Sequence, residues 1–195
     1  MNERTIDVSG YGLFCLSIEA FTFFLRKHKI RTKKLNNFLD KNRHLLEEAM
    51  REGYLLPIAT INSIGYIIDL GETDEIEVFS SGWQEVLALD NCNMMVGSDA
   101  AVWVGSLDSL DAWNSKEYEG RANRSYQTLD GETLYSAQKF NVYPAKYKVR
   151  IVGFKRKRAL PYPVANFGFA FSLTETESFD TFTNPLVEDV NIAKM

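Results

Sequence analysis

The chain has 195 residues, a hydrophobic fraction of 45%, 13% aromatic residues and a formal net charge of −4, which is the composition of a globular protein and excludes a disordered chain. The sequence shows no apolar run of about 18 residues, as a membrane-spanning helix needs, and no basic start followed by an apolar stretch, as a secretory signal needs. We therefore expect a single domain over 1–195, a cytoplasmic location and no membrane partner.

The first predicted element is a strand over 11–18, because apolar residues occupy both of its faces. The next segment, 19–30, fits either a short helix or an extended edge strand, since it is rich in aromatic side chains. The clearest helix is predicted over 34–52, where apolar residues recur at steps of three and four and Asn42 is the one polar member of the stripe. Gly53 stands where a helix often ends.

After this helix the sequence is typical of short strands separated by Gly, Asn and Ser turns, which favours a sandwich or barrel. Strands are predicted over 55–61, 66–70, 75–79, 94–96 and 100–104. The polar segment 107–129 is expected to be a long surface loop with a brief helix around Trp113, and loops of this length are often functional.

A pair of antiparallel strands joined at Pro144 is predicted within 133–154, where apolar and basic residues alternate in the second strand. A last strand over 167–173 carries three phenylalanines on one face and small residues on the other. The tail, 175–195, is expected to be loosely attached. The predicted fold is thus mostly β (α+β), an antiparallel β-sandwich with one amphipathic helix packed on it.

No residue pattern predicts a catalytic, cofactor or metal site. Phosphate loops, dinucleotide fingerprints and nucleophile elbows are missing from the sequence. Cys15 and Cys92 are too few for a disulfide framework and are expected as reduced thiols in or near the core. The basic run 155–158 has the charge to hold phosphate, but the negative net charge favours a solvent-exposed strand end. We therefore expect no cofactor and no nucleic-acid partner.

The charges divide the chain unequally. No Lys or Arg lies between Arg51 and Lys116, whereas eleven carboxylates do, which leaves +7 on the rest of the chain (22 basic against 15 acidic residues). If these carboxylates lie together, they form a negative face that attracts a basic partner; otherwise they are solubilising loop charges. Trp83 and Trp113 in this segment are either interface anchors or core residues. The predicted partner-binding residues are Asp69, Glu72, Asp74, Glu75, Glu77, Trp83, Glu85, Asp90, Asp99, Asp108, Asp111 and Trp113.

Four features, in this order, resemble one known family. They are the aromatic strand YGLFCLSI, the helix end EEAMREGY from Glu47 to Tyr54, an apolar strand directly after it, and the later YPAKYKVRIVGF. The chain is similar in these features to the competence J protein, the inhibitor of a bacterial DNA-entry nuclease, and to the wider group of small β-sandwich proteins found beside bacterial toxins. It is longer than the typical member, with extra material around 70–125. The resemblance implies a non-enzymatic binding protein with a sandwich fold.

Three hypotheses about function follow. The first is a protein inhibitor of the immunity type, which binds a basic toxin or nuclease with carboxylates placed where phosphates would lie. The second is a hydrolase or lyase on a β scaffold that uses the segment 107–129. The third is an assembly module that associates with copies of itself through strand edges.

Overall fold

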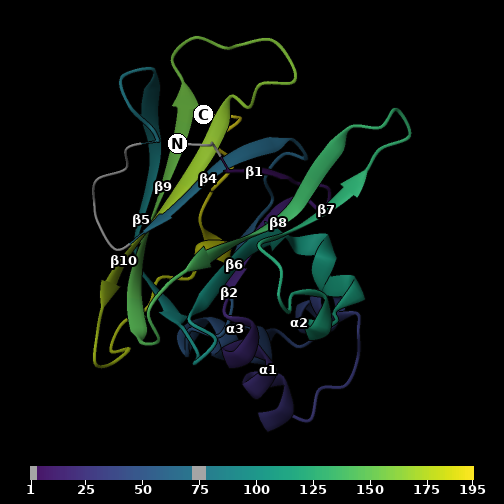
Figure 1. The fold of residues 1–195 in the computed structure, drawn as a ribbon. Coiled ribbons are helices and arrows are strands. Elements are labelled where there is room, and N and C mark those ends of the chain that lie inside the picture. Colours follow the sequence, from purple (N-terminus) through teal and green to yellow (C-terminus); the bar gives the residue numbers. More distant parts are fainter. Residues whose placement is uncertain (1–3, 72–77) are drawn as a thin grey trace.

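The computed structural model describes residues 4–71 and 78–195, and in it two five-stranded sheets pack face to face (Figure 1). In sheet A the strand order is β1 (Arg4–Asp7), β4 (Gly65–Gly71), β10 (Phe167–Glu175), β9 (Lys146–Arg156) and β5 (Trp83–Met95). In sheet B the order is β3 (Leu56–Ala59), β2 (Gly12–Leu16), β6 (Ala101–Ser106), β8 (Thr133–Asn141) and β7 (Asn123–Gln127). Neighbouring strands are antiparallel except β4 and β10, which are parallel. The expected mostly β sandwich is confirmed.

The main core lies between the two sheets. Sheet A contributes side chains such as Ile68 and Phe169, and sheet B contributes Leu13 and Val104, all at 2% exposure or less. Alternate residues of each strand point inward, as the period of two predicts. Burial of apolar area on this scale is the largest favourable contribution to folding.

Both cysteines lie in this core, as expected. Cys15 of β2 contacts the Met94 sulfur at 3.8 Å, and both cysteines are free thiols. Burial raises the pKa of Cys15 well above its usual value and raises the pKa of Cys92 to about 12. Because the thiolate is the reactive form, both thiols are poor nucleophiles at neutral pH.

Within the described residues, three helices rather than one cover the outer face of sheet B: α1 (Ile18–Lys27), α2 (Leu35–Lys41) and α3 (Arg43–Arg51). The predicted single helix over 34–52 is wrong because the chain breaks at Asn42, where φ is −118° and ψ is 62°. The Asn42 side-chain amide donates to the Phe38 carbonyl oxygen at 2.8 Å, and such local bonds compete with helix continuation. The one polar residue of the apolar stripe therefore marks the break.

The ambiguous segment 19–30 is helical through most of its length because Ser17 begins α1. Its Oγ accepts the Ala20 N–H at 3.4 Å, and Phe21 and Phe24 turn inward onto sheet B. The aromatic side chains of this segment, which are also typical of a strand, fill the space between the helices and sheet B.

The segment 107–129 is folded rather than a long surface loop. It forms two 3₁₀ helices, η1 (Leu107–Ala112) and η2 (Ser115–Glu117), and then β7. Leu107, Leu110 and Trp113, spaced by three residues, are buried against the helical layer. This spacing matches the three residues per turn of a 3₁₀ helix. The pattern is not evident in the sequence because polar residues separate the three apolar ones.

The tail, 175–195, is also better anchored than expected. It forms a short 3₁₀ helix, η3 (Pro185–Val187), and then buries Val190 and Ile192 in the core between the sheets. The Asn191 side-chain amide donates to the Thr60 carbonyl oxygen at 3.1 Å. Phe182 and Leu186 of the tail also pack against the core on the helical side of sheet B, so the tail is attached at several points along its length.

The strands on either side of Pro144 do not pair with each other. β8 pairs with β6 and β7 in sheet B, whereas β9 pairs with β10 and β5 in sheet A. The Pro144 turn therefore carries the chain from one sheet to the other. Residue alternation identified the inward faces, since Phe140, Tyr147 and Val149 all enter the same core. Alternation does not say which sheet a face belongs to, and that is why the predicted pair is wrong.

Candidate partner-binding site

The acidic middle third does not form one face. The structure describes six carboxylates of the predicted site, and they lie in three places. Asp69 is on β4, Glu85 and Asp90 are on β5, and Asp99, Asp108 and Asp111 lie beside sheet B. The strands β4 and β5 are separated in sheet A by β10 and β9. Glu72, Asp74, Glu75 and Glu77 lie outside the described residues. Consecutive segments here cross from one part of the fold to another, so closeness in sequence does not become closeness in space.

Two of these carboxylates hold helix ends in place. Asp99, in the turn between β5 and β6, accepts the Ser17 hydroxyl at 2.8 Å and the Glu19 N–H at 3.3 Å, at the beginning of α1. Asp111 accepts the Asn37 N–H at 3.0 Å, at the beginning of α2. Carboxylates near helix N-termini are stabilising, so both residues have a structural role.

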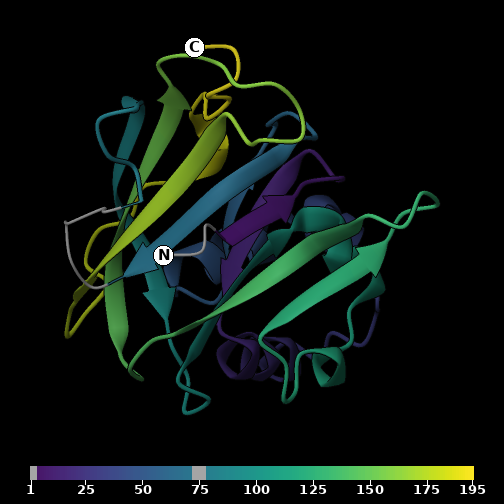
Figure 2. The same ribbon diagram turned by 45° about the horizontal axis from the view of Figure 1, so that its top comes forward.

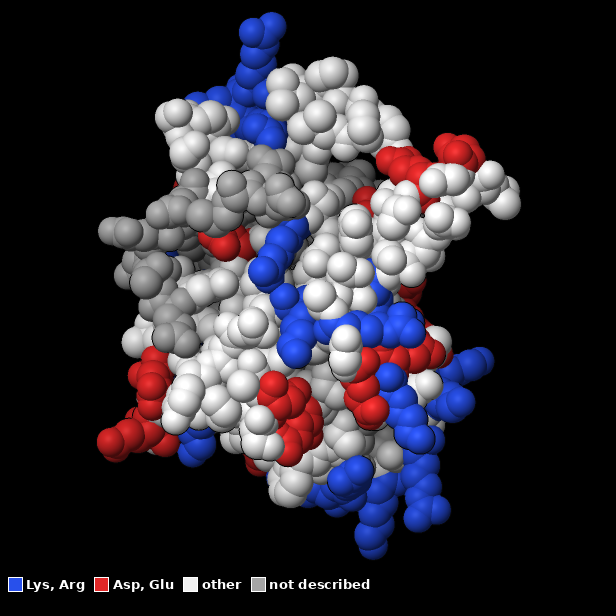
Figure 3. All heavy atoms as spheres, viewed as in Figure 1, with Lys and Arg blue, Asp and Glu red and all other residues white. Residues whose placement is uncertain are grey.

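The carboxylates on β5 have a basic neighbour in space. Glu85 and Asp90 lie 3.9 Å and 3.8 Å from the guanidinium of Arg150, which is on the adjacent strand β9. The acidic segment contains no Lys or Arg, but the carboxylates on β5 are not isolated from positive charge, because the neighbouring strand β9 supplies Arg150. In Figure 3 acidic and basic side chains are interspersed over the face shown.

Neither Trp83 nor Trp113 is an exposed anchor. Trp83 is 7% exposed, contacts Phe79 with ring centroids 5.0 Å apart, and lies under the Arg156 guanidinium. Trp113 is 8% exposed and meets Phe21 edge to face at 5.1 Å. Both are core residues on the outer faces of the two sheets, where an indole buries a large apolar area.

A different acidic site forms where the two sheets meet. A cavity of about 440 Å³ opens between the end of β1, the β7–β8 hairpin and the loop that joins β9 to β10. Asp7, Tyr126, Glu132 and Tyr162 line it, and among the described residues that line it there is no Lys or Arg. We call this site the acidic groove.

Each residue of the acidic groove is positioned by a separate element. Asp7 ends β1 and accepts the Tyr135 N–H of β8 at 2.9 Å. Tyr126 lies on β7, and Glu132 directly precedes β8. The hydroxyl of Tyr162 donates to Glu132 at 3.2 Å, which joins the β9–β10 loop to the hairpin.

The electrostatics of the acidic groove are those of uncompensated negative charge. Burial raises the pKa of Asp7, and the charge of Glu132 raises it further. The charge of Glu132 also raises the pKa of Tyr162, and burial followed by the charge of Asp7 raises the pKa of Tyr126. The contributions of Glu132 and Asp7 to these shifts report a site in which a further negative charge is unfavourable, whereas burial, the larger cause for Asp7 and Tyr126, disfavours charge of either sign.

Exposed apolar groups surround these charges. Tyr162 is 84% exposed, Tyr126 is 45% exposed, and Leu129 at the tip of the hairpin is fully exposed. The tip is closed by the Thr128 N–H, which donates to the Glu132 carbonyl oxygen at 2.9 Å, and by Gly131 with φ of +87°. The hairpin projects from the body of the molecule (Figure 2), and its acidic side chains are visible at the upper right of Figure 3.

The sequence held one signal for this site. Asp130 followed by Gly131 is a strong hairpin turn signal, and it indicates that acidic residues stand at a projecting tip. Asp7, Tyr126 and Tyr162 come from distant segments and belong to no motif. Only the packing of the sheets brings them together.

Comparison with protein-family models, with curated proteins and with solved structures gives no match. The resemblance to the competence J protein group stays a prediction. In the described part of the chain, no helix has both the length and the apolar character needed to cross a membrane.

Proposed function

We propose that this chain is a non-catalytic binding protein that holds a basic protein partner in the acidic groove. The observation that carries the proposal is the pairing of Asp7 and Glu132 with two tyrosine rings, in a cavity with no Lys or Arg among its described lining residues. A partner's Arg or Lys side chain in this cavity meets carboxylates and ring faces together. The proposed site replaces the acidic middle third as the partner-binding region.

The surroundings of the groove suit a protein partner better than a small cation. Leu129, Tyr126 and Tyr162 offer exposed apolar area beside the charges. Protein interfaces combine aromatic anchors with a polar rim, and complementary charge accelerates their association. The projecting hairpin reaches beyond the body of the molecule, as an element that enters a partner's cleft must.

The partner class follows from the same chemistry. A toxin or nuclease that holds phosphate backbones presents a basic cleft, and the two carboxylates of the groove take the place of phosphates in it. The family resemblance implies a protein that inhibits a nuclease, and occupation of the basic cleft is one way to inhibit it. We therefore propose that the protein is an inhibitor of the immunity type.

A peptide series tests the groove directly. We expect short Arg- and Lys-containing peptides to bind, and the matched peptides with Gln at the basic positions not to bind, when binding is followed by NMR shifts of the groove residues. The double variant Asp7→Asn, Glu132→Gln should weaken binding about tenfold or more, since it removes both attractive charges. The matched control is Glu85→Gln, Asp90→Asn, which makes the same charge change on β5 and should have no effect. Equal binding by both double variants would contradict the proposed site.

A further inference from the structure

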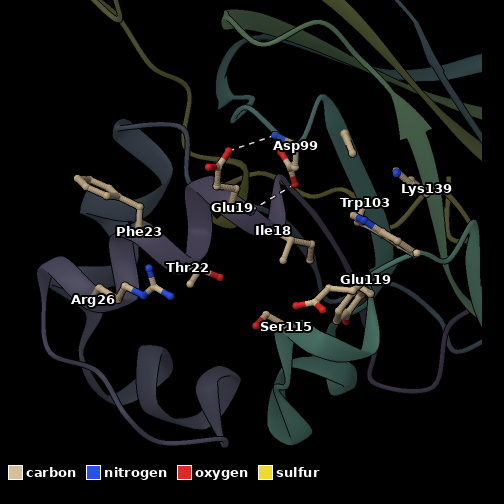
Figure 4. Close-up of a pocket in the computed structure, with 13 residues that line it drawn as sticks. Ile18, Glu19, Thr22, Phe23, Arg26, Asp99, Trp103, Ser115, Glu119 and Lys139 are labelled. Carbon is tan, nitrogen blue, oxygen red and sulfur yellow. Dashed lines mark hydrogen bonds between the residues drawn. The ribbon is translucent and has the colours of Figure 1, made fainter.

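A second cavity, of about 460 Å³, lies on the helix-covered side of sheet B. Figure 4 shows α1 on one side of it and the segment 115–120 on the other, with Trp103 of β6 and Lys139 of β8 completing its wall. This volume falls within the roughly 300–1,000 Å³ typical of small-ligand sites. The acidic groove shares none of its lining residues.

Part of the wall of this helix-side cavity is formed by apolar side chains that are held in place by their neighbours. Ile18 and Trp103 line it, and the indole is only 2% exposed, so it is fixed by its neighbours. Close by, the Thr22 Oγ1 is buried and has no hydrogen-bond partner among the described residues. A buried hydroxyl without a partner is unfavourable, and a polar ligand atom would satisfy it.

Opposite charges enter the cavity from its two sides without meeting. In Figure 4 the Arg26 guanidinium, from α1, and the Glu119 carboxylate, from the segment after η2, lie on opposite sides of the cavity. Within the described part of the chain neither residue forms an ion pair. Separated charges of this kind match a ligand that carries both a carboxylate and an ammonium group.

The other two carboxylates of the cavity are already occupied. Glu19 accepts the Asp99 N–H at 3.1 Å and Asp99 accepts the Glu19 N–H at 3.3 Å, a reciprocal pair drawn in Figure 4. Glu19 also accepts the Ser98 hydroxyl, which together with the Asp99 N–H lowers the pKa of Glu19. The Glu19 and Asp99 carboxylates already accept these hydrogen bonds, and Glu119 is the carboxylate left to meet a ligand.

We propose that the helix-side cavity binds a zwitterionic α-amino acid with an apolar side chain. The ligand carboxylate accepts two N–H bonds from Arg26 and the hydroxyl bond of Thr22, and the ligand ammonium pairs with Glu119. The ligand side chain lies on Ile18 and Trp103. This site is separate from the proposed partner-binding groove.

Calorimetry with a matched ligand panel tests this proposal. The probes are L-leucine and L-phenylalanine, their N-acetyl derivatives, which lack the ammonium group, and their amides, which lack the carboxylate. We expect the free amino acids to bind and each derivative to bind about 10- to 100-fold more weakly. Arg26→Gln should remove the difference between amino acid and amide, and Glu119→Gln the difference between amino acid and N-acetyl derivative.

The variants are suited to the test because Arg26 and Glu119 are exposed, so their replacement should leave the thermal midpoint unchanged. Arg31→Gln and Glu188→Gln change the same charges at exposed positions outside the cavity and should bind as the wild type does. No binding of any free amino acid at millimolar concentration would overturn the proposal. Binding that neither Arg26→Gln nor Glu119→Gln weakens would overturn it as well.

Discussion

At the scale of single residues, Trp83 and Trp113 show how burial decides between interface and core. Trp113 packs edge to face on Phe21, and Tyr118 lies beside it with ring centroids 5.6 Å apart. The sequence places Trp113 in a polar, acidic segment, which is also the composition of an exposed anchor. The three-residue spacing that buries it becomes evident only when the 3₁₀ helix is seen.

Trp113→Ala should therefore destabilise the protein by about 3–5 kcal/mol, because it removes a buried indole from the layer between the helices and sheet B. Urea denaturation measures this change. Tyr143→Ala is the control, since Tyr143 is 71% exposed, and it should change stability by less than about 0.5 kcal/mol. A small effect of Trp113→Ala on stability, with a large effect on partner binding, would restore the anchor interpretation.

Asp7 carries a stability cost that depends on pH. Its folded-state pKa is raised by burial and by Glu132, so ionisation of Asp7 destabilises the folded state. The cost is absent below the unfolded-state pKa, develops as the pH rises through the raised folded-state pKa, and is complete above it. Asp7→Asn should therefore raise the thermal midpoint at neutral pH, and the gain should disappear at acidic pH where the wild-type carboxyl is protonated.

The measurement is a pair of thermal unfolding series over pH for the wild type and Asp7→Asn. Asn keeps an oxygen that can accept the Tyr135 N–H, so the bond seen at 2.9 Å need not be lost. A variant that is less stable than the wild type at neutral pH would show that Asp7 is held by attractive charge. It would also contradict the negative potential assigned to the groove.

At the scale of elements, the beginning of α1 joins three parts of the chain. Ser17 is fully buried, and its Oγ accepts the N–H groups of Ala20 and Gly97 and donates to Asp99 at 2.8 Å. This single hydroxyl serves as helix cap and also fixes the β5–β6 turn. The residue pattern of the segment 19–30 is compatible with either a helix or an edge strand and does not decide between them.

Ser17→Ala should destabilise the protein by about 1–3 kcal/mol, since it leaves a helix end uncapped and buried polar groups without partners. Denaturant unfolding gives the value. Thr32→Ala is a matched control, because the Thr32 hydroxyl accepts an N–H at an exposed position, and its effect should be smaller. Equal losses for the two variants would mean that the Ser17 network adds little to stability.

The elements themselves were largely predictable from the sequence, and their partners were not. Strict alternation located β9 and β10 with the correct inward faces, and the apolar stripe located α2 and α3. The pairing of β8 with sheet B and β9 with sheet A depends on contacts between distant segments. No local pattern around Pro144 encodes that choice, because both strands present an apolar face to the same core.

The long strand β5 illustrates a second limit. Only its end, 94–96, was predicted. Apolar residues are present in its first half, such as Val86, Leu87 and Leu89, but they do not alternate with polar ones, and the register shifts twice, between Glu85 and Leu87 and between Leu89 and Cys92. Each bulge breaks the period of two on which strand prediction depends. Edge strands often carry such bulges and charges, which discourage pairing with other chains.

At the scale of the whole molecule, the fold redistributes charge. The sequence concentrates carboxylates in one third of the chain, yet the structure separates those described and uses Asp99 and Asp111 at helix ends. The acidic groove instead draws on segments that are not conspicuous in the sequence. The proposed binding site, made where two sheets and a hairpin meet, could not be predicted before the topology was known.

The groove predicts how partner binding depends on solution conditions. Because its residues are largely exposed, affinity should fall as salt rises from about 0.05 M to 0.5 M, with a Debye length that shortens from about 14 Å to about 4 Å. Affinity should also fall as the pH drops through the raised pKa of Asp7, because a neutral carboxyl no longer attracts the partner's cation. Titrations with an Arg-containing peptide measure both effects, and affinity that is indifferent to salt and pH would contradict the electrostatic account.

The most direct measurement is affinity capture from a lysate of the native cells with three baits side by side, at low and then high salt, followed by mass identification. The baits are the wild type, the groove variant Asp7→Asn, Glu132→Gln, and the β5 variant Glu85→Gln, Asp90→Asn. We predict a basic protein that is retained by the wild type and the β5 variant, is lost from the groove variant, and is released by high salt. A partner retained equally by the groove variant, or the recovery of no protein except the bait itself, would contradict a partner-binding function of the acidic groove.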